Sequence, residues 1–225
     1  MLINNIDTTK YNAALLDYHI ENSEIVTLEE WENNWLVPFR TGQFFKYVNI
    51  NCEFEIDMMT ENEAQKNISK LIKQASQATL KFDDLDFFYD GYLESHTKEK
   101  IIRGKYIVNL NFKCSLGYEE AVTKNIANTS SITLNSTATT PVIIEIIPTE
   151  NREIVNIKGF GEDIAIKNLT AGKKVIIDGE KGLITENGQN KWLDYDSWGF
   201  PKLEPGSNEI ETDIPITIRY KPRWI

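Results

Sequence analysis

Residues 47–57 read YVNINCEFEID, and this stretch decides how the chain begins to fold. From Val48 to Ile56 every second residue is apolar, and the residues between them are Asn or Glu. A period of two is typical of a strand that buries one face and leaves the other in water. Residues 106–114, YIVNLNFKC, repeat the pattern. We therefore expect two long, half-buried strands.

One amphipathic helix is predicted between these strands. Residues 60–63, TENE, match a capping box, which satisfies the free N–H groups at the start of a helix. Apolar residues then recur at helical spacing, at Ala64, Ile68, Leu71, Ile72 and Ala75. The lysines on the opposite face are expected to be solvated: Lys66, Lys70 and Lys73.

The C-terminal half is predicted to be all-β. Short apolar runs occur at residues 142–147, 154–158, 164–168, 175–178 and 216–220. Turn signals such as Asp178-Gly179 and Asn187-Gly188 separate some of them. Many short strands without a helical period favour a β-sandwich. We expect an antiparallel α+β domain with one helix over residues 1–120 and a β-sandwich over residues 121–225.

The chain is acidic, and this argues against nucleic-acid binding. Its 225 residues include 24 Lys and Arg against 34 Asp and Glu, a net charge of −10. Such a surface does not neutralise phosphates. Residues 1–120 carry 12 basic and 20 acidic side chains, so most of the acidity lies in the first domain. With neither a long apolar run nor a signal-like start, we expect no membrane span and folding in the cytoplasm.

The motifs of common enzymes and cofactor sites do not occur. His19 and His96 are isolated, and no zinc-site spacing is present. The GFGEDI stretch at residues 159–164 lacks the third glycine of a dinucleotide fingerprint, so a hairpin turn is expected. Cys52 and Cys114 fall on the apolar sides of the two strands and are expected to be buried.

The acidic residues give no catalytic motif either. The stretch DDLDFFYDG at residues 83–91 lacks the carboxylates of a calcium loop. A carboxylate pair for glycoside hydrolysis stays open, because sequence cannot measure the distance between two acids. We expect no enzymatic activity, no cofactor and no metal site.

One constellation suggests binding: Trp192, Tyr195 and Trp198, spaced three apart beside Asp194 and Asp196. Flat aromatic faces next to carboxylates are suited to holding a sugar ring. The same residues are also consistent with a loop anchored on the domain or with contact to another subunit, and the pattern favours this plainer interpretation. The sequence leaves these alternatives open.

The chain resembles the distal tail protein family of long-tailed bacteriophages over nearly its whole length. In the C-terminal half the similarity lies in VIID (175–178), GLI (182–184), FPKLEPGSN (200–208) and ITIRYKPR (216–223). In the N-terminal half it lies in LKFDD (80–84), FYDGY (88–92) and NFKCSLGY (111–118).

The resemblance implies a two-domain structural hub at the tail tip of the virion. Its N-terminal belt domain would close a homo-hexameric ring around the channel through which DNA leaves without specific binding. Its C-terminal galectin-like or carbohydrate-module-like sandwich would project outward. The implied partners are the tail tube protein, a lysin-like tail tip protein and the receptor-binding protein. The alternative is a module that contacts host glycans through the sandwich.

Within such a ring, the polar sides of the two long strands are candidates for the channel wall. Glu53, Glu55 and Asp57 are the acidic members of the first strand, and Asn109 and Asn111 belong to the second. Like charge would let the genome slide past. We therefore expect Glu53, Glu55 and Asp57 to face the channel.

Overall fold

The computed structural model describes residues 1–21, 25–30 and 39–225. The chain divides into two units, which we describe separately: Met1–Tyr118 with Ile225, and Glu119–Trp224. The elements of the first unit are β1 (Leu2–Ile3), β2 (Ile6–Asp7), the 3-10 turn η1 (Thr8–Tyr11), β3 (Ala13–Glu21), β4 (Ile25–Glu30), β5 (Phe39–Phe45), β6 (Val48–Asp57), α1 (Glu61–Ala75), β7 (Gln77–Lys81), β8 (Phe88–Ile102), β9 (Lys105–Cys114) and β10 (Gly117–Tyr118).

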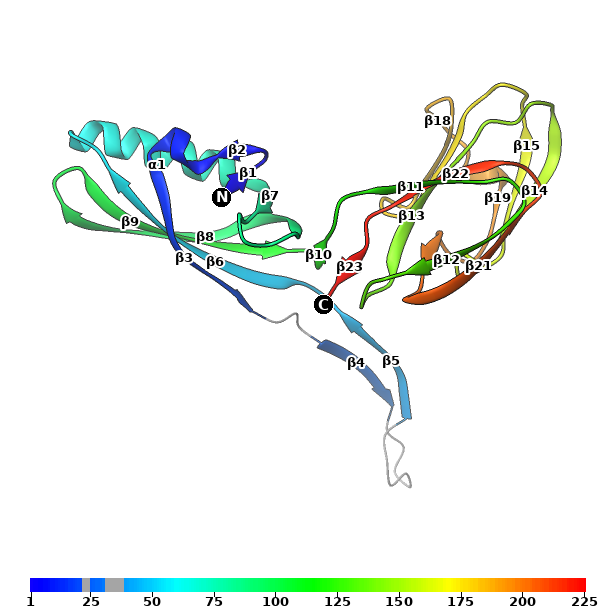
Figure 1. The fold of residues 1–225 in the computed structure, drawn as a ribbon, viewed down its shortest axis with the longest axis horizontal. Coiled ribbons are helices and arrows are strands. Elements are labelled where there is room, and N and C mark those ends of the chain that lie inside the picture. Colours follow the sequence, from blue (N-terminus) through cyan, green and yellow to red (C-terminus); the bar gives the residue numbers. More distant parts are fainter. Residues whose placement is uncertain (22–24, 31–38) are drawn as a thin grey trace. The chain divides into compact units, whose positions relative to one another are not determined.

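The first unit is built on one antiparallel sheet with strand order β2-β1-β7-β8-β9-β6-β3. The two strands predicted from the alternating pattern, β6 and β9, are direct neighbours, with Ile50 opposite Phe112 and Phe54 opposite Val108. The hairpin of β4 and β5 forms a separate two-stranded sheet. The predicted strands are therefore interior strands, and the strands on either side of them complete the sheet (Figure 1).

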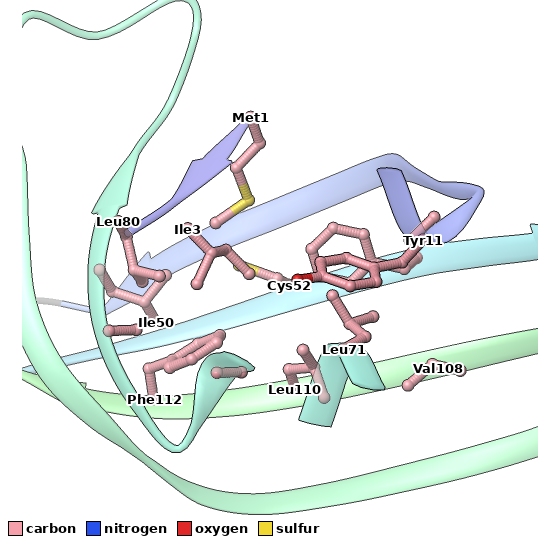
Figure 2. Close-up of a cluster of buried hydrophobic side chains, with 14 of the residues drawn as sticks. Met1, Ile3, Tyr11, Ile50, Cys52, Leu71, Leu80, Val108, Leu110 and Phe112 are labelled. Carbon is pink, nitrogen blue, oxygen red and sulfur yellow. The ribbon is translucent and has the colours of Figure 1, made fainter. Parts of the chain in front are cut away.

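The helix α1 covers one face of this sheet, as Figure 1 shows. It begins where the sequence predicts, because the Thr60 side chain accepts a hydrogen bond from the Glu63 N–H. The residues that it buries include Ala64, Ile68 and Leu71. They pack on the apolar side of β6 and β9, with the buried side chains of Met1, Ile3 and Tyr11 completing the cluster (Figure 2). The other face of the sheet is therefore left polar.

The second unit contains two antiparallel sheets. Its elements are β11 (Val122–Ile126), β12 (Thr129–Leu134), β13 (Thr140–Ile146), β14 (Arg152–Lys158), β15 (Ile164–Leu169), β16 (Val175–Asp178), β17 (Leu183–Glu186), β18 (Gln189–Asn190), the 3-10 turn η2 (Trp192–Asp194), β19 (Tyr195–Asp196), β20 (Lys202–Leu203), β21 (Gly206–Thr212), β22 (Ile216–Tyr220) and β23 (Arg223–Trp224).

One core is shared by both of these sheets. The first sheet has the order β11-β22-β13-β16-β17-β18, and the second β12-β21-β14-β15-β19. Buried side chains from the first, such as Ile144 and Ile177, belong to the same cluster as Val155 and Ile166 from the second. The predicted hairpin at residues 159–164 is confirmed, because β14 and β15 pair on either side of it. The C-terminal half is all-β among the elements described.

Candidate interaction surfaces

The outer face of the N-terminal sheet is the face opposite α1, and it carries the acidic residues predicted for a channel wall. Glu53, Glu55 and Asp57 alternate along β6 with the buried residues Phe54 and Ile56. Their side chains therefore point away from the core, because successive side chains of a strand point to opposite faces. All three side chains therefore lie on the outer face of the sheet, along the single strand β6.

One lysine side chain, that of Lys105, partly neutralises this outer face. The Lys105 ammonium lies 2.8 Å from a Glu55 carboxylate oxygen and 3.8 Å from one of Asp57. The hydrogen bond to Glu55 is the main cause of the raised pKa of Lys105. Glu53 forms no ion pair with any described residue, and it lies opposite Asp17 of β3. Glu53 and Asp17 therefore place two unpaired negative charges opposite each other on this face.

An amide ladder crosses the same face beside the acidic residues. Asn51 donates from Nδ2 to Oδ1 of Asn111 at 2.7 Å, and Asn111 donates from Nδ2 to Oγ of Ser95 at 3.0 Å. Asn49 donates to Glu21 at 3.2 Å. These bonds fix the side chains of β3, β6, β9 and β8 across the sheet. The outer face is therefore an ordered polar surface.

The three aromatic residues predicted to bind lie in one loop of the second unit, residues 190–200, which we call the aromatic loop. The Trp192 ring lies 5.9 Å from the Tyr195 ring and 5.6 Å from the Phe200 ring, measured between centroids. Tyr195 and Phe200 stack at 5.9 Å, and both pack on the core of the unit. Tyr195 also donates its hydroxyl hydrogen to the Gly199 carbonyl. Trp192, Tyr195 and Phe200 thus form a three-ring cluster.

A buried lysine fixes the start of this loop. The Lys191 ammonium donates to the Asn168 carbonyl and to an Asp194 carboxylate oxygen, both at 2.9 Å, and lies 3.5 Å from Glu186. Asp194 accepts a further hydrogen bond from the Asn168 side chain at 2.8 Å. The bonds from Lys191 and Asn168 lower the pKa of Asp194. Because a buried charge needs such partners, this network sets the path of the chain.

The three predicted residues have different surroundings. Trp198 is 99% exposed and Trp192 is 52% exposed, whereas Tyr195 is half-buried. Leu193, which the sequence analysis did not single out, is 98% exposed on the same loop. A single leucine in a polar loop has no pattern by which the sequence could reveal it. The loop therefore presents large apolar groups to water beside the residues of its three-ring cluster.

The cysteines are buried, as predicted. Both Cys52 and Cys114 lie in the core of the first unit. Burial raises the pKa of both thiols, that of Cys114 to about 12. Within the described residues, no group of three or more His, Cys, Asp or Glu could hold a metal ion. In the same residues, no helix is long and apolar enough to cross a membrane.

Comparisons with known proteins point to phage tails. Residues 135–224 match the family model of the siphovirus-type tail component, C-terminal domain. None of the curated proteins matches the sequence. The crystal structure of SPP1 Dit (gp 19.1), described as a paradigm of the hub adsorption apparatus in Gram-positive infecting phages, matches with a TM-score of 0.78 at 15% identity. This match covers 100% of the present chain and 98% of SPP1 Dit.

A second fold match is to the baseplate of phage P2 in its activated conformation with Ca. It has a TM-score of 0.57 at 12% identity and covers 97% of this chain and 93% of that one. The predicted resemblance to the distal tail protein family is therefore confirmed, by the family model in the C-terminal unit and by the fold over the whole chain.

Proposed function

We propose that this chain, a distal tail-type phage protein by its C-terminal domain and its fold, is a structural subunit of the hub at the tail tip of a long-tailed phage. The observation that carries the proposal is the fold match to SPP1 Dit over the full length of both chains. The hub would join the tail tube protein to the lysin-like tip protein and the receptor-binding protein. No catalytic role is proposed for any residue.

Two unpaired strand edges in the first unit support assembly into a ring. β3 ends the strand order of the sheet, and no described strand pairs with its outer edge. From Ser95 to Ile102, β8 has only β9 beside it among the described strands. Exposed edges favour pairing with another chain, and a contact between different surfaces closes into a ring when its rotation permits. We assign residues 1–120 to a homo-hexameric ring and residues 121–225 to an outward domain of galectin-like type.

The outer face of the sheet is proposed to line the DNA channel. Glu53, Glu55 and Asp57 point outward on one strand, beside the amide ladder. DNA would pass this surface without being held, because both carry negative charge. Particles in which Glu53, Glu55 and Asp57 are replaced by Lys should assemble and release DNA more slowly. Normal release from such particles would remove these residues from the channel wall.

The location of the protein tests the hub assignment directly. A gold-labelled antibody against this chain, applied to intact particles, should mark the distal end of the tail. Labelling along the tube or at the capsid would contradict a hub at the tip. Purified tube protein provides the control for antibody specificity.

Host glycan binding by the C-terminal unit is the second candidate. It is favoured by the exposed indole of Trp198 and by the half-exposed indole of Trp192, which contacts the Tyr195 ring. It predicts that the purified chain binds host wall polysaccharide and that Trp198→Ala removes this binding. Isothermal titration with purified polysaccharide measures it.

A further inference from the structure

The aromatic loop exposes more apolar surface to water than is usual for a loop that only connects two strands. Leu193 and Trp198 are 98% and 99% exposed, and Trp192 is 52% exposed. Scattered apolar residues on a surface are ordinary. Here, however, three large ones lie within seven consecutive positions of one loop. Tryptophan is also one of the residues enriched among those that contribute most to binding at protein interfaces.

These exposed side chains are held on a prepared support. Lys191 fixes the start of the loop through three oxygen atoms, and the Trp192 N–H donates to the Asn190 side chain at 2.8 Å. The ring cluster fixes the middle, and Tyr195 closes the end by its bond to Gly199. A preformed loop loses little conformational entropy on binding, so more of its contact free energy appears as affinity.

The polar groups beside the rings do not favour a sugar. A sugar ring stacked on an indole needs hydrogen-bonding partners for its hydroxyls. Asp194 uses both carboxylate oxygens on Lys191 and Asn168. Asp196 is paired with Lys167 at 2.9 Å. The two carboxylates that suggested a sugar site are therefore already engaged with Lys191 and with residues of β15, whereas the exposed apolar side chains have no such partners.

The charges around the loop favour a basic partner over a second copy of this chain. The carboxylates that the loop carries or contacts outnumber its lysines: Glu162, Glu186, Asp194 and Asp196 against Lys167 and Lys191. Both lysines are already paired with carboxylates. In a contact between two copies of this chain, the carboxylates around one loop would repel those around the other. Lysine and arginine side chains on a different partner would attract them.

We propose that Leu193 and Trp198, together with the edge of Trp192, form a protein-docking site. The partner is a different protein of the tail tip. It receives these side chains in an apolar pocket that is surrounded by Lys or Arg. The proposal rests on the proposed hub function, since it needs a neighbour in the virion. Lys191, Tyr195 and Phe200 act as positioning residues beneath the site.

Photo-crosslinking within assembled particles tests the site. Benzoylphenylalanine is placed at position 198, and in a control at Lys173, an exposed residue elsewhere in the same unit. Position 198 should crosslink to one other tail protein, at a peptide that contains apolar and basic residues, at least tenfold more than position 173. Crosslinks only to another copy of this chain, or none above the control, would overturn the proposal.

Binding measurements distinguish a protein-docking site from a glycan-binding site. The double variant Leu193→Ala with Trp198→Ala should lose at least tenfold affinity for the crosslinked protein, whereas Ile154→Ala, which also shortens an exposed apolar side chain, should not. Glu162→Lys should weaken binding mainly at low salt. Binding of the wild-type chain to purified wall polysaccharide, lost in the double variant, would assign the loop to a glycan instead.

Failure of the docking site is distinguishable from failure of the hub. If the wild-type chain forms rings and the double variant is incorporated with an unchanged set of tail proteins, only the docking site is wrong. If the wild-type chain never enters a tail, the hub is wrong. Both substituted side chains are almost fully exposed, so the melting temperature of the variant should match that of the wild type.

Discussion

The two units of this protein solve the same packing problem in different ways. The first covers one face of its large sheet with α1, leaves the opposite face polar, and has unpaired edges at β3 and along the outer half of β8 among the described strands. The second buries one face of each of two sheets against the other, and its two most exposed large apolar side chains, Leu193 and Trp198, lie on one loop. The first design suits edge-to-edge assembly, and the second suits a domain that meets its partner at one place.

The largest expected effect tests whether the two cores are independent. Phe54→Ala, in the first core, should lower the unfolding free energy of that unit by about 3–5 kcal/mol and leave the other unchanged. Phe160→Ala, in the second core, should do the reverse. Differential scanning calorimetry should resolve the two transitions. Equal shifts of both transitions by either variant would show that the units unfold as one.

A turn in the second unit should depend on glycine. Gly159 has a φ of +89°, and an added Cβ would lie 1.9 Å from the Glu209 carbonyl oxygen. Gly159→Ala should therefore cost about 2–4 kcal/mol, measured by urea unfolding of the second transition. Gly172 also has a positive φ but no neighbour within 4 Å. Gly172→Ala should cost about 1 kcal/mol, and an equal loss in both variants would refute the steric argument.

The support of the aromatic loop should depend on Lys191. Lys191→Met leaves Asp194 and Glu186 without their cation, so the second unit should lose about 1–3 kcal/mol. Tryptophan fluorescence should change at the same time, because Trp192 follows Lys191 directly. Lys167→Met removes only an exposed pair with Asp196 and should cost at most about 1 kcal/mol. An unchanged fluorescence spectrum in Lys191→Met would show that the loop holds its shape without the network.

The smallest expected effect is a change with pH in the stability of the same loop. The folded-state pKa of Asp194 lies below its ordinary value of 3.8, so the folded state binds fewer protons than the unfolded state in this range. The stabilisation is complete above pH 3.8 and is lost as the pH falls through the lower, folded value. Tryptophan fluorescence of the wild type should therefore change below pH 3.8. In Asp194→Asn this transition should be absent, and its persistence would assign it to another carboxylate.

Much of the fold could be predicted where burial leaves a regular pattern. β6 and β9 alternate strictly because one face of each is buried, and α1 begins at a residue whose side chain caps it. β3 was missed because a bulge between Leu15 and Asp17 interrupts its alternation. The outer half of β8 was missed because its residues are exposed, which leaves no apolar period.

The candidate surfaces were predictable in part for the same reason. Glu53, Glu55 and Asp57 inherit their common face from the alternation of β6. The aromatic spacing drew attention to Trp192, Tyr195 and Trp198, but only coordinates separate the half-buried Tyr195 from the exposed Trp198. The hydrogen bonds and ion pairs of Lys191 join residues that are far apart in the sequence. No local sequence pattern could therefore predict them.

The mass of the purified chain, measured by light scattering together with negative-stain imaging, tests the central claim most directly. A hub subunit should form closed rings of uniform size, alone or when the neighbouring tail proteins are added, and rings of this chain alone should have a mass that is a fixed multiple of 25.9 kDa. A chain that stays monomeric at every concentration, and that its neighbouring tail proteins never recruit into rings, would contradict the account.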